Sequence, residues 1–218
     1  MLFRSHREFL VNNAARAREV LAVCPKKYRG WEWHYLVKIC HSDLITLADK
    51  HTGALTAGRY SLDGTRILTA GTDGAVQIWD VRNGTTIFSA PGKVALTGAA
   101  FAPDGNRFAT AGMDGTVRVW DAAAEKLLFT IPAHRPVATS VVFHPNGTKL
   151  LTTGWDRTAK VWDAESGKLH LTIGGGGLGY FTAAFSPDGT RALTAGVDGN
   201  ARLWDADTGK ELTVDRKS

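Results

Sequence analysis

The chain has few cysteines and no long apolar run, and each shortage excludes a class of protein. Its two cysteines, Cys24 and Cys40, lack the C-x-x-C spacing of a redox or zinc site, so no disulfide framework is expected. No apolar run approaches the roughly 18 residues that span a bilayer, and the N-terminus lacks the pattern of a signal peptide. The sequence therefore predicts a soluble chain with no membrane segment, cytoplasmic as it stands.

Recognisable catalytic motifs are also missing. The sequence holds no G-x-S-x-G, H-E-x-x-H, Walker or EF-hand pattern. The run GGGGLG at 174–179 satisfies G-x-G-x-x-G, but the residues that follow, YFTAAF, are typical of a strand, whereas a dinucleotide site needs a helix there. We therefore expect no enzyme, no cofactor and no metal ion.

The net charge of +5 lies in one part of the chain. Residues 1–42 hold eight Lys/Arg against three acidic residues, whereas the other 176 residues hold 18 of each. A nucleic-acid interface is more often a basic stripe with stacking aromatics on the folded body, and this body is neutral. Nucleic acid is therefore not the expected partner, and binding through the basic N-terminal segment stays open as an alternative.

What the sequence has in abundance is one repeated pattern, with an interval of 41 or 42 residues. Its four copies begin at Thr69, Thr110, Thr152 and Thr194 and read TAGTDGAVQIWD, TAGMDGTVRVWD, TTGWDRTAKVWD and TAGVDGNARLWD. Apolar residues alternate within a copy, as Val76 and Ile78 do around Gln77, and this period of two predicts β-strands.

Turn signals divide each repeat into strands. An Asp-Gly or Asn-Gly pair separates two apolar runs before each copy and predicts a tight hairpin, at Asp63, Asp104, Asn146 and Asp188. In three of the four repeats a glycine also follows the Trp-Asp pair, where a turn would need a positive φ. Each repeat therefore predicts four short antiparallel strands, and such sheets must stack to bury both faces, as the blades of a β-propeller do.

The Trp-Asp ending, the upstream turn and the interval resemble the WD-repeat family of propellers over residues 43–218. The resemblance implies an all-β fold, with blades at about 52–90, 93–131, 134–173 and 178–214. The segment DLITLAD at 43–49 is typical of a last strand, and KELTV at 210–214 supplies that of the fourth blade. Four blades are fewer than the family's usual seven or eight. We therefore expect an incomplete ring, a compact four-bladed ring or a homodimer that completes the ring, and we favour an incomplete or self-associating one.

In that family a buried tetrad of His, Ser/Thr, Asp and Trp ties the strands of a blade together. The first and third repeats hold complete tetrads: His51, Thr69, Asp73, Trp79 and His134, Thr152, Asp156, Trp162. The second and fourth hold three members, with Gly92 and Gly176 in place of histidine: Thr110, Asp114, Trp120 and Thr194, Asp198, Trp204. Because the pattern recurs with its histidine missing twice, we interpret it as structural and not as a catalytic triad.

The resemblance implies a platform for a protein or peptide partner. In the family the residue before each turn aspartate tends to lie on the binding rim, and these residues are Thr72, Met113, Trp155 and Val197, with Arg135 near in sequence. A propeller enzyme, such as a lactonase or hydrolase, is the other alternative. It would need acids or histidines on the inner strands, which here are small and apolar.

Residues 1–42 have a different pattern. AARAREVLAVCP and RGWEWHYLVKIC space their apolar residues at helical intervals and predict a small helical hairpin. The phrase CPKKYRGWEWHYLVKICH is similar to the junction before the WD repeats of planctomycete-type bacterial serine/threonine protein kinases. The kinase motifs themselves are missing. The resemblance therefore implies a sensor or scaffold module, which would lie outside the cytoplasm if it belonged to a membrane-anchored kinase.

Overall fold

The structure, a computed structural model of the chain, describes residues 21–25, 30, 33, 47, 51–174 and 178–212. The chain divides into two compact units, residues 1–46 and 47–218. In the first unit, the Trp33 indole N–H donates to the carbonyl of Leu21 at 3.1 Å. The predicted helical hairpin and the strand at 43–49 otherwise lie outside the described residues.

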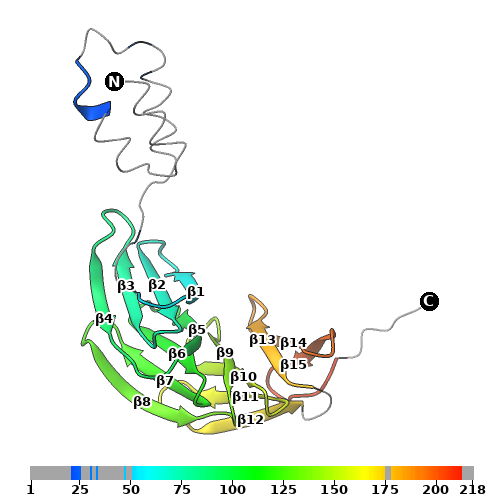
Figure 1. Cartoon of the computed structure of the whole chain (residues 1–218). Helices are drawn as coiled ribbons and strands as arrows, with labels where there is room; N and C mark the ends of the chain where they lie inside the picture. The colour runs from blue at the N-terminus through cyan, green and yellow to red at the C-terminus, as the bar shows by residue number, and fades with distance from the viewer. Residues whose placement is uncertain are drawn as a thin grey trace. The chain divides into compact units, whose positions relative to one another are not determined.

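The second unit consists of antiparallel sheets that follow one another along the chain, one for each repeat (Figure 1). We call them blades 1 to 4. Blade 1 is β1 (Leu55–Tyr60), β2 (Arg66–Gly71), β3 (Val76–Asp80) and β4 (Thr86–Ala90). Blade 2 is β5 (Leu96–Phe101), β6 (Arg107–Gly112), β7 (Thr116–Asp121) and β8 (Lys126–Pro132). Blade 3 is β9 (Ala138–Phe143), β10 (Lys149–Gly154), β11 (Thr158–Asp163) and β12 (Leu169–Gly174), and blade 4 is β13 (Tyr180–Phe185), β14 (Arg191–Gly196) and β15 (Ala201–Asp205).

The predicted turns are confirmed. The glycine of each Asp-Gly or Asn-Gly hairpin has a φ of 67° to 76°, at Gly64, Gly105, Gly147 and Gly189. After the Trp-Asp pair, three blades again use glycine with a φ of 69°, whereas blade 2 places Glu125 there with a φ of 51°. A side chain in this left-handed region is strained, because its Cβ crowds the carbonyl oxygen.

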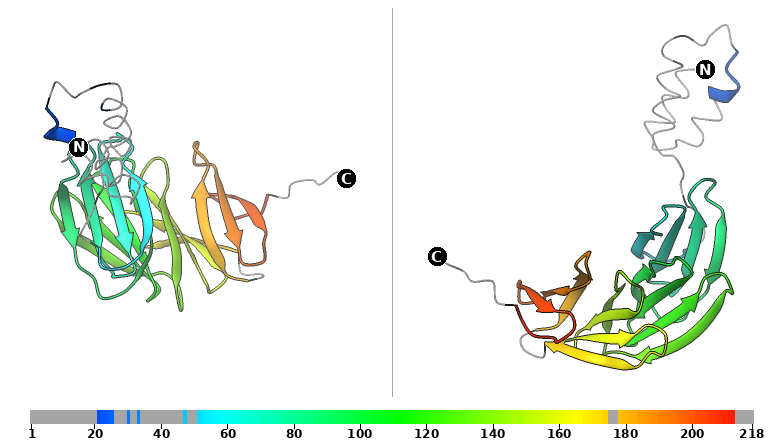
Figure 2. Two further views of the ribbon diagram at one scale, coloured as in Figure 1. Left: turned by 45° about the horizontal axis from the view of Figure 1, so that its top comes forward. Right: turned by 180° about the vertical axis from the view of Figure 1, so that it is seen from behind.

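The blades stack through their inner strands and form an open arc, not a closed ring (Figures 1 and 2). Contacts join β1 to β5, β5 to β9 and β9 to β13. Each junction buries an apolar layer: between blades 1 and 2, Phe88 packs edge-on against Phe108, which stacks on Trp120 at 5.9 Å between ring centroids. The expectation of an all-β fold with an incomplete ring is confirmed, and the alternative of a compact four-bladed ring is not.

Blade 4 differs from the expected four strands. Its sheet has three, and the segment at 210–214 contributes an isolated bridge between Trp204 and Glu211 and one backbone hydrogen bond, from Leu212 N–H to the carbonyl of Leu203 at 2.8 Å. Pairing therefore begins as the sequence predicts, but too few described residues pair to make a strand.

Candidate functional site

In blade 3 the four residues of the predicted tetrad form one hydrogen-bonded chain. Trp162 Nε1–H donates to Thr152 Oγ1 at 2.8 Å, the Thr152 hydroxyl lies 2.8 Å from His134 Nε2, and His134 Nδ1 lies 2.9 Å from Asp156. A neutral imidazole with its proton on Nδ1 satisfies every link. Burial lowers the pKa of His134 below its usual value, although Asp156 opposes this effect, and the ring is therefore neutral near pH 7.

Blade 1 repeats this chain with longer contacts to the aspartate. Trp79 Nε1–H donates to Thr69 at 2.9 Å, and His51 Nε2 lies 2.9 Å from the same hydroxyl. His51 Nδ1 lies 3.3 Å from Asp73, which also accepts backbone N–H bonds from Thr52 at 2.7 Å and Ala75 at 3.0 Å. These bonds outweigh burial and lower the pKa of Asp73 to about 2.

The hydroxyls and imidazoles of these networks are shielded from solvent. Thr152 is fully buried and His134 is 3% exposed, so no substrate reaches either atom. A nucleophile needs access to a carbonyl and an oxyanion site beside it. The networks instead connect the middle strands of a blade to the loop before its inner strand.

The residue before each turn aspartate occupies the same place in all four blades. Its backbone N–H donates to the carbonyl of the residue immediately before the inner strand, at 2.9 to 3.2 Å, for Thr72, Met113, Trp155 and Val197. The four side chains therefore lie at the same edge of successive blades. We call this edge the rim.

Every predicted rim residue is exposed. Met113 is 57%, Trp155 55% and Val197 45% exposed, and Thr72 and Arg135 are exposed as well. Leu178, which is 49% exposed, directly precedes the residue that accepts the Val197 N–H bond. Sequence reasoning missed Leu178 because the glycine-rich run around it was interpreted only as a loop.

The family model of the WD domain, G-beta repeat (WD40), matches residues 42–80, 84–121, 125–163 and 177–205, more than half of the chain. The chain belongs to the WD40 repeat family. The comparison with curated proteins gives no match. WD40 repeats serve as protein-interaction scaffolds and are in general not enzymes. Among the described residues, no cluster of His, Cys, Asp or Glu could hold a metal ion, and no helix is long and apolar enough to cross a membrane.

In blades 2 and 4 of this WD40 chain, which lack the histidine, an arginine binds the turn aspartate instead. In blade 4, Arg202 donates to Asp198 at 2.5 Å. The phenol of Tyr180, which is 1% exposed, interacts with the Thr194 side chain. Burial raises the pKa of Tyr180 above its usual value. Arg202 thus takes the contact with the turn aspartate that the imidazole makes in blade 3, and Tyr180 lies beside the threonine. Gly176 itself lies outside the described residues.

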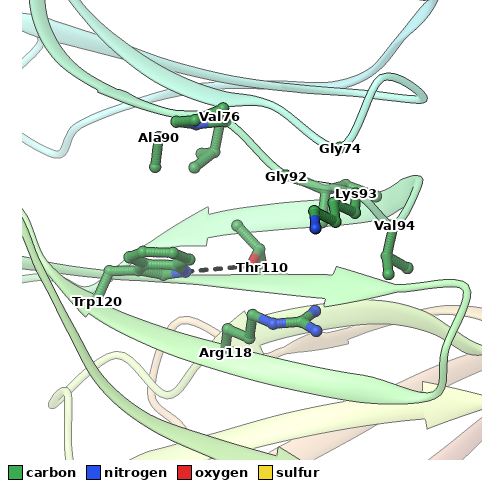
Figure 3. A pocket seen from close by; sticks show the side chains of 11 residues that line it. Gly74, Val76, Ala90, Gly92, Lys93, Val94, Thr110, Arg118 and Trp120 are labelled. Carbon is green, nitrogen blue, oxygen red and sulfur yellow. Dashed lines mark hydrogen bonds between the residues drawn. The ribbon is translucent and has the colours of Figure 1, made fainter.

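Blade 2 replaces only one of the two bonds. Arg118 donates to Asp114 at 2.7 Å, as Arg202 does in blade 4. Leu96 stands where blade 4 has Tyr180, since both begin the inner strand of their blade and pair with a glycine. Thr110 accepts from Trp120 at 3.2 Å, the longest such bond of the four blades. A cavity of about 160 Å³ lies beside Thr110 (Figure 3).

A signal for the two arginines was present in the sequence. The residue two positions before the tryptophan is arginine in TVRVWD and NARLWD, the two repeats that lack histidine. It is glutamine in AVQIWD and lysine in TAKVWD, where the histidine is present. The pattern becomes meaningful only once the structure shows that this residue reaches the turn aspartate.

Proposed function

We propose that the rim is the surface through which this WD40 chain binds a protein or peptide partner, without catalysis. The observation that carries the proposal is the exposure of Trp155 and Met113 at equivalent positions of neighbouring blades. Tryptophan and methionine are enriched at protein interfaces, because a large or pliable apolar side chain gains much from desolvation. Arg135 adds an exposed cation to the same edge.

The test is selection of peptides from a display library on the intact chain, followed by binding measurements with variants. Trp155→Ala is expected to weaken the binding of the selected peptides by about 2 kcal/mol or more, as the loss of an interface hot spot does. Leu169→Ala is the matched control, because Leu169 is 52% exposed on β12, away from the rim. Peptides that bind Trp155→Ala and Met113→Ala as they bind the unchanged chain would contradict the proposal.

We further propose that the chain is the regulatory part of a bacterial serine/threonine kinase-like protein. The support is the resemblance of residues 24–41 to the junction before the repeats of such kinases. An antibody raised against the blades tests this on native cells. A band far above 23.5 kDa whose peptides include a kinase domain is expected, and a band at 23.5 kDa would overturn it.

We also propose that the two end faces of the arc pair with those of a second copy. Leu55 is 57% exposed in blade 1, whereas the equivalent Leu96 and Ala138 are 5% and 0% exposed. At the other end Leu193 is 44% exposed, although the equivalent Leu151 is fully buried. Apolar faces of this kind mark interaction sites. Light scattering is expected to give twice the chain mass, and Leu55→Lys is expected to return it to one chain; a monomeric unchanged chain would exclude the pairing.

A further inference from the structure

The cavity beside Thr110 lies between blades 1 and 2, and the threonines equivalent to Thr110 in blades 1 and 3 bond an imidazole. Lys93 and Val94, from the loop between β4 and β5, line one side, and Thr110, Arg118 and Trp120 line another. Apolar residues, among them Val76, Ala90 and Leu96, line the rest. This loop lies at the rim, because Met113 N–H donates to the carbonyl of Ala95 within it. The inference that follows rests on the proposed rim function and names one group that the rim would take.

Three hydrogen-bond donors line this space. Thr110 is 1% exposed, and its oxygen accepts the Trp120 N–H, which leaves its own hydroxyl proton for another acceptor. Arg118 donates to Asp114 from one terminal nitrogen and has further N–H groups. In Figure 3 the Lys93 and Arg118 side chains enter the space from opposite sides, with Thr110 between them.

The charge around the cavity favours an anion. The Arg118 guanidinium is balanced by Asp114, whereas Lys93 is exposed and makes no ion pair with any residue that the structure describes. The site therefore carries an excess of one positive charge, and an incoming imidazolium or ammonium group would be repelled. A volume of about 160 Å³ holds a carboxylate together with some of its water, since one water takes about 30 Å³.

We propose that this cavity binds the carboxylate of an acidic side chain from the partner peptide. The carboxylate accepts hydrogen bonds from the Thr110 hydroxyl, Lys93 and Arg118, and charged partners make such bonds strong. The other blades cannot offer this site. His51 and His134 bond the equivalent threonine in blades 1 and 3, and in blade 4 the buried Tyr180 lies beside Thr194.

Acetate, acetamide and imidazole are the probes, and the readout is the indole N–H signal of Trp120 in a nitrogen-15 NMR spectrum. Acetate is expected to shift this signal in a saturable manner, less strongly as salt rises, because ions screen the attraction. Acetamide has the same shape without the charge and is expected to shift it far less. Trp120→Phe identifies the signal among those of the other tryptophans.

Two variants locate the site. Lys93 lies in an exposed loop. Lys93→Gln is expected to lower the affinity for acetate about tenfold, as the loss of one hydrogen bond to a charged group does. Lys126→Gln is its matched control on the exposed β8 and is expected to change nothing. A double variant, Leu96→Tyr with Pro91→Gly, copies blade 4, where the Tyr180 hydroxyl lies next to Gly174. It is expected to fill the cavity and abolish the acetate response.

Several results would overturn the inference. These are a Trp120 signal that acetate does not move, one that acetamide or imidazole moves as much, or an acetate affinity that is unchanged in Lys93→Gln. None of these measurements requires the partner. If rim-binding peptides lose affinity in Trp155→Ala but not in Lys93→Gln, the rim function stands and only the carboxylate site fails.

Discussion

Blades 2 and 3 share the Thr, Asp and Trp of their repeat but differ in what joins them. Blade 3 closes the chain from Trp162 to Asp156 with an imidazole, whereas blade 2 ties Asp114 to an arginine and leaves a cavity beside Thr110. Both nevertheless form complete four-stranded sheets with the same register. The strand pattern and the turns are therefore sufficient to form a blade, and the hydrogen-bonded network adds stability and fills the space behind the rim.

The largest effect is expected from removing the tryptophan of the complete network. Trp162→Ala deletes a large side chain that is 7% exposed and leaves the Thr152 hydroxyl without its donor. We expect the free energy of unfolding to fall by about 3–5 kcal/mol, as for other buried aromatics. Urea denaturation measures it. An unchanged transition midpoint would mean that Trp162 does not hold blade 3 together.

The comparison itself is sharpened by one substitution made in each blade. Thr152→Val keeps the shape but leaves Trp162 Nε1–H and His134 Nε2 without their partner in a buried site, which we expect to cost about 1–3 kcal/mol. Thr110→Val leaves only the Trp120 N–H, beside a cavity that water can enter, and we expect a cost under about 1 kcal/mol. Equal costs in denaturation experiments would show that the histidine adds nothing to the network.

The histidine also predicts a dependence on pH that blade 2 lacks. Because the pKa of His134 is lowered in the folded state, protons bind the unfolded chain first as the pH falls below about 6.5. Stability is thus fully present above that pH and is lost below it, down to the folded-state pKa. In His134→Gln the slope of the unfolding free energy between pH 7 and pH 5 is expected to decrease; an unchanged slope would assign the pH dependence to other groups.

The smallest effect concerns a turn in blade 2. Glu125 has a φ of 51° where the other blades have glycine, so Glu125→Gly is expected to relieve strain and to stabilise the chain by under about 1 kcal/mol. Gly167→Ala in blade 3 is the mirror experiment, because it places a Cβ at a φ of 69° and is expected to destabilise. Thermal denaturation of both variants compares the two turns, and a destabilised Glu125→Gly would contradict the argument.

Most of the fold could be predicted because its signals are local. Alternating apolar residues, as in AVQIWD, identify the strands, and turn glycines such as Gly64 fix the hairpins. The alternation did not show that Gln77, on the other face of β3, is also buried, because a neighbouring blade covers that face. The network residues were predictable because they recur at constant spacing. Arg118, Arg202 and Tyr180 were not identified, since their partners are known only once strands lie side by side. The rim position was predicted from the resemblance, but the 55% exposure of Trp155 required the structure.

The sequence by itself determined that the chain forms all-β blades with tight turns, because strand periodicity and turn chemistry act over a few residues and repeat four times. Only the tertiary structure decided that the four blades form an open arc and that the described residues of blade 4 make three strands. It alone also decided how the missing histidines are replaced. In blade 4 a buried phenol lies beside Thr194, whereas in blade 2 the equivalent leucine and Thr110 line a cavity, and such contacts depend on how neighbouring strands and blades pack.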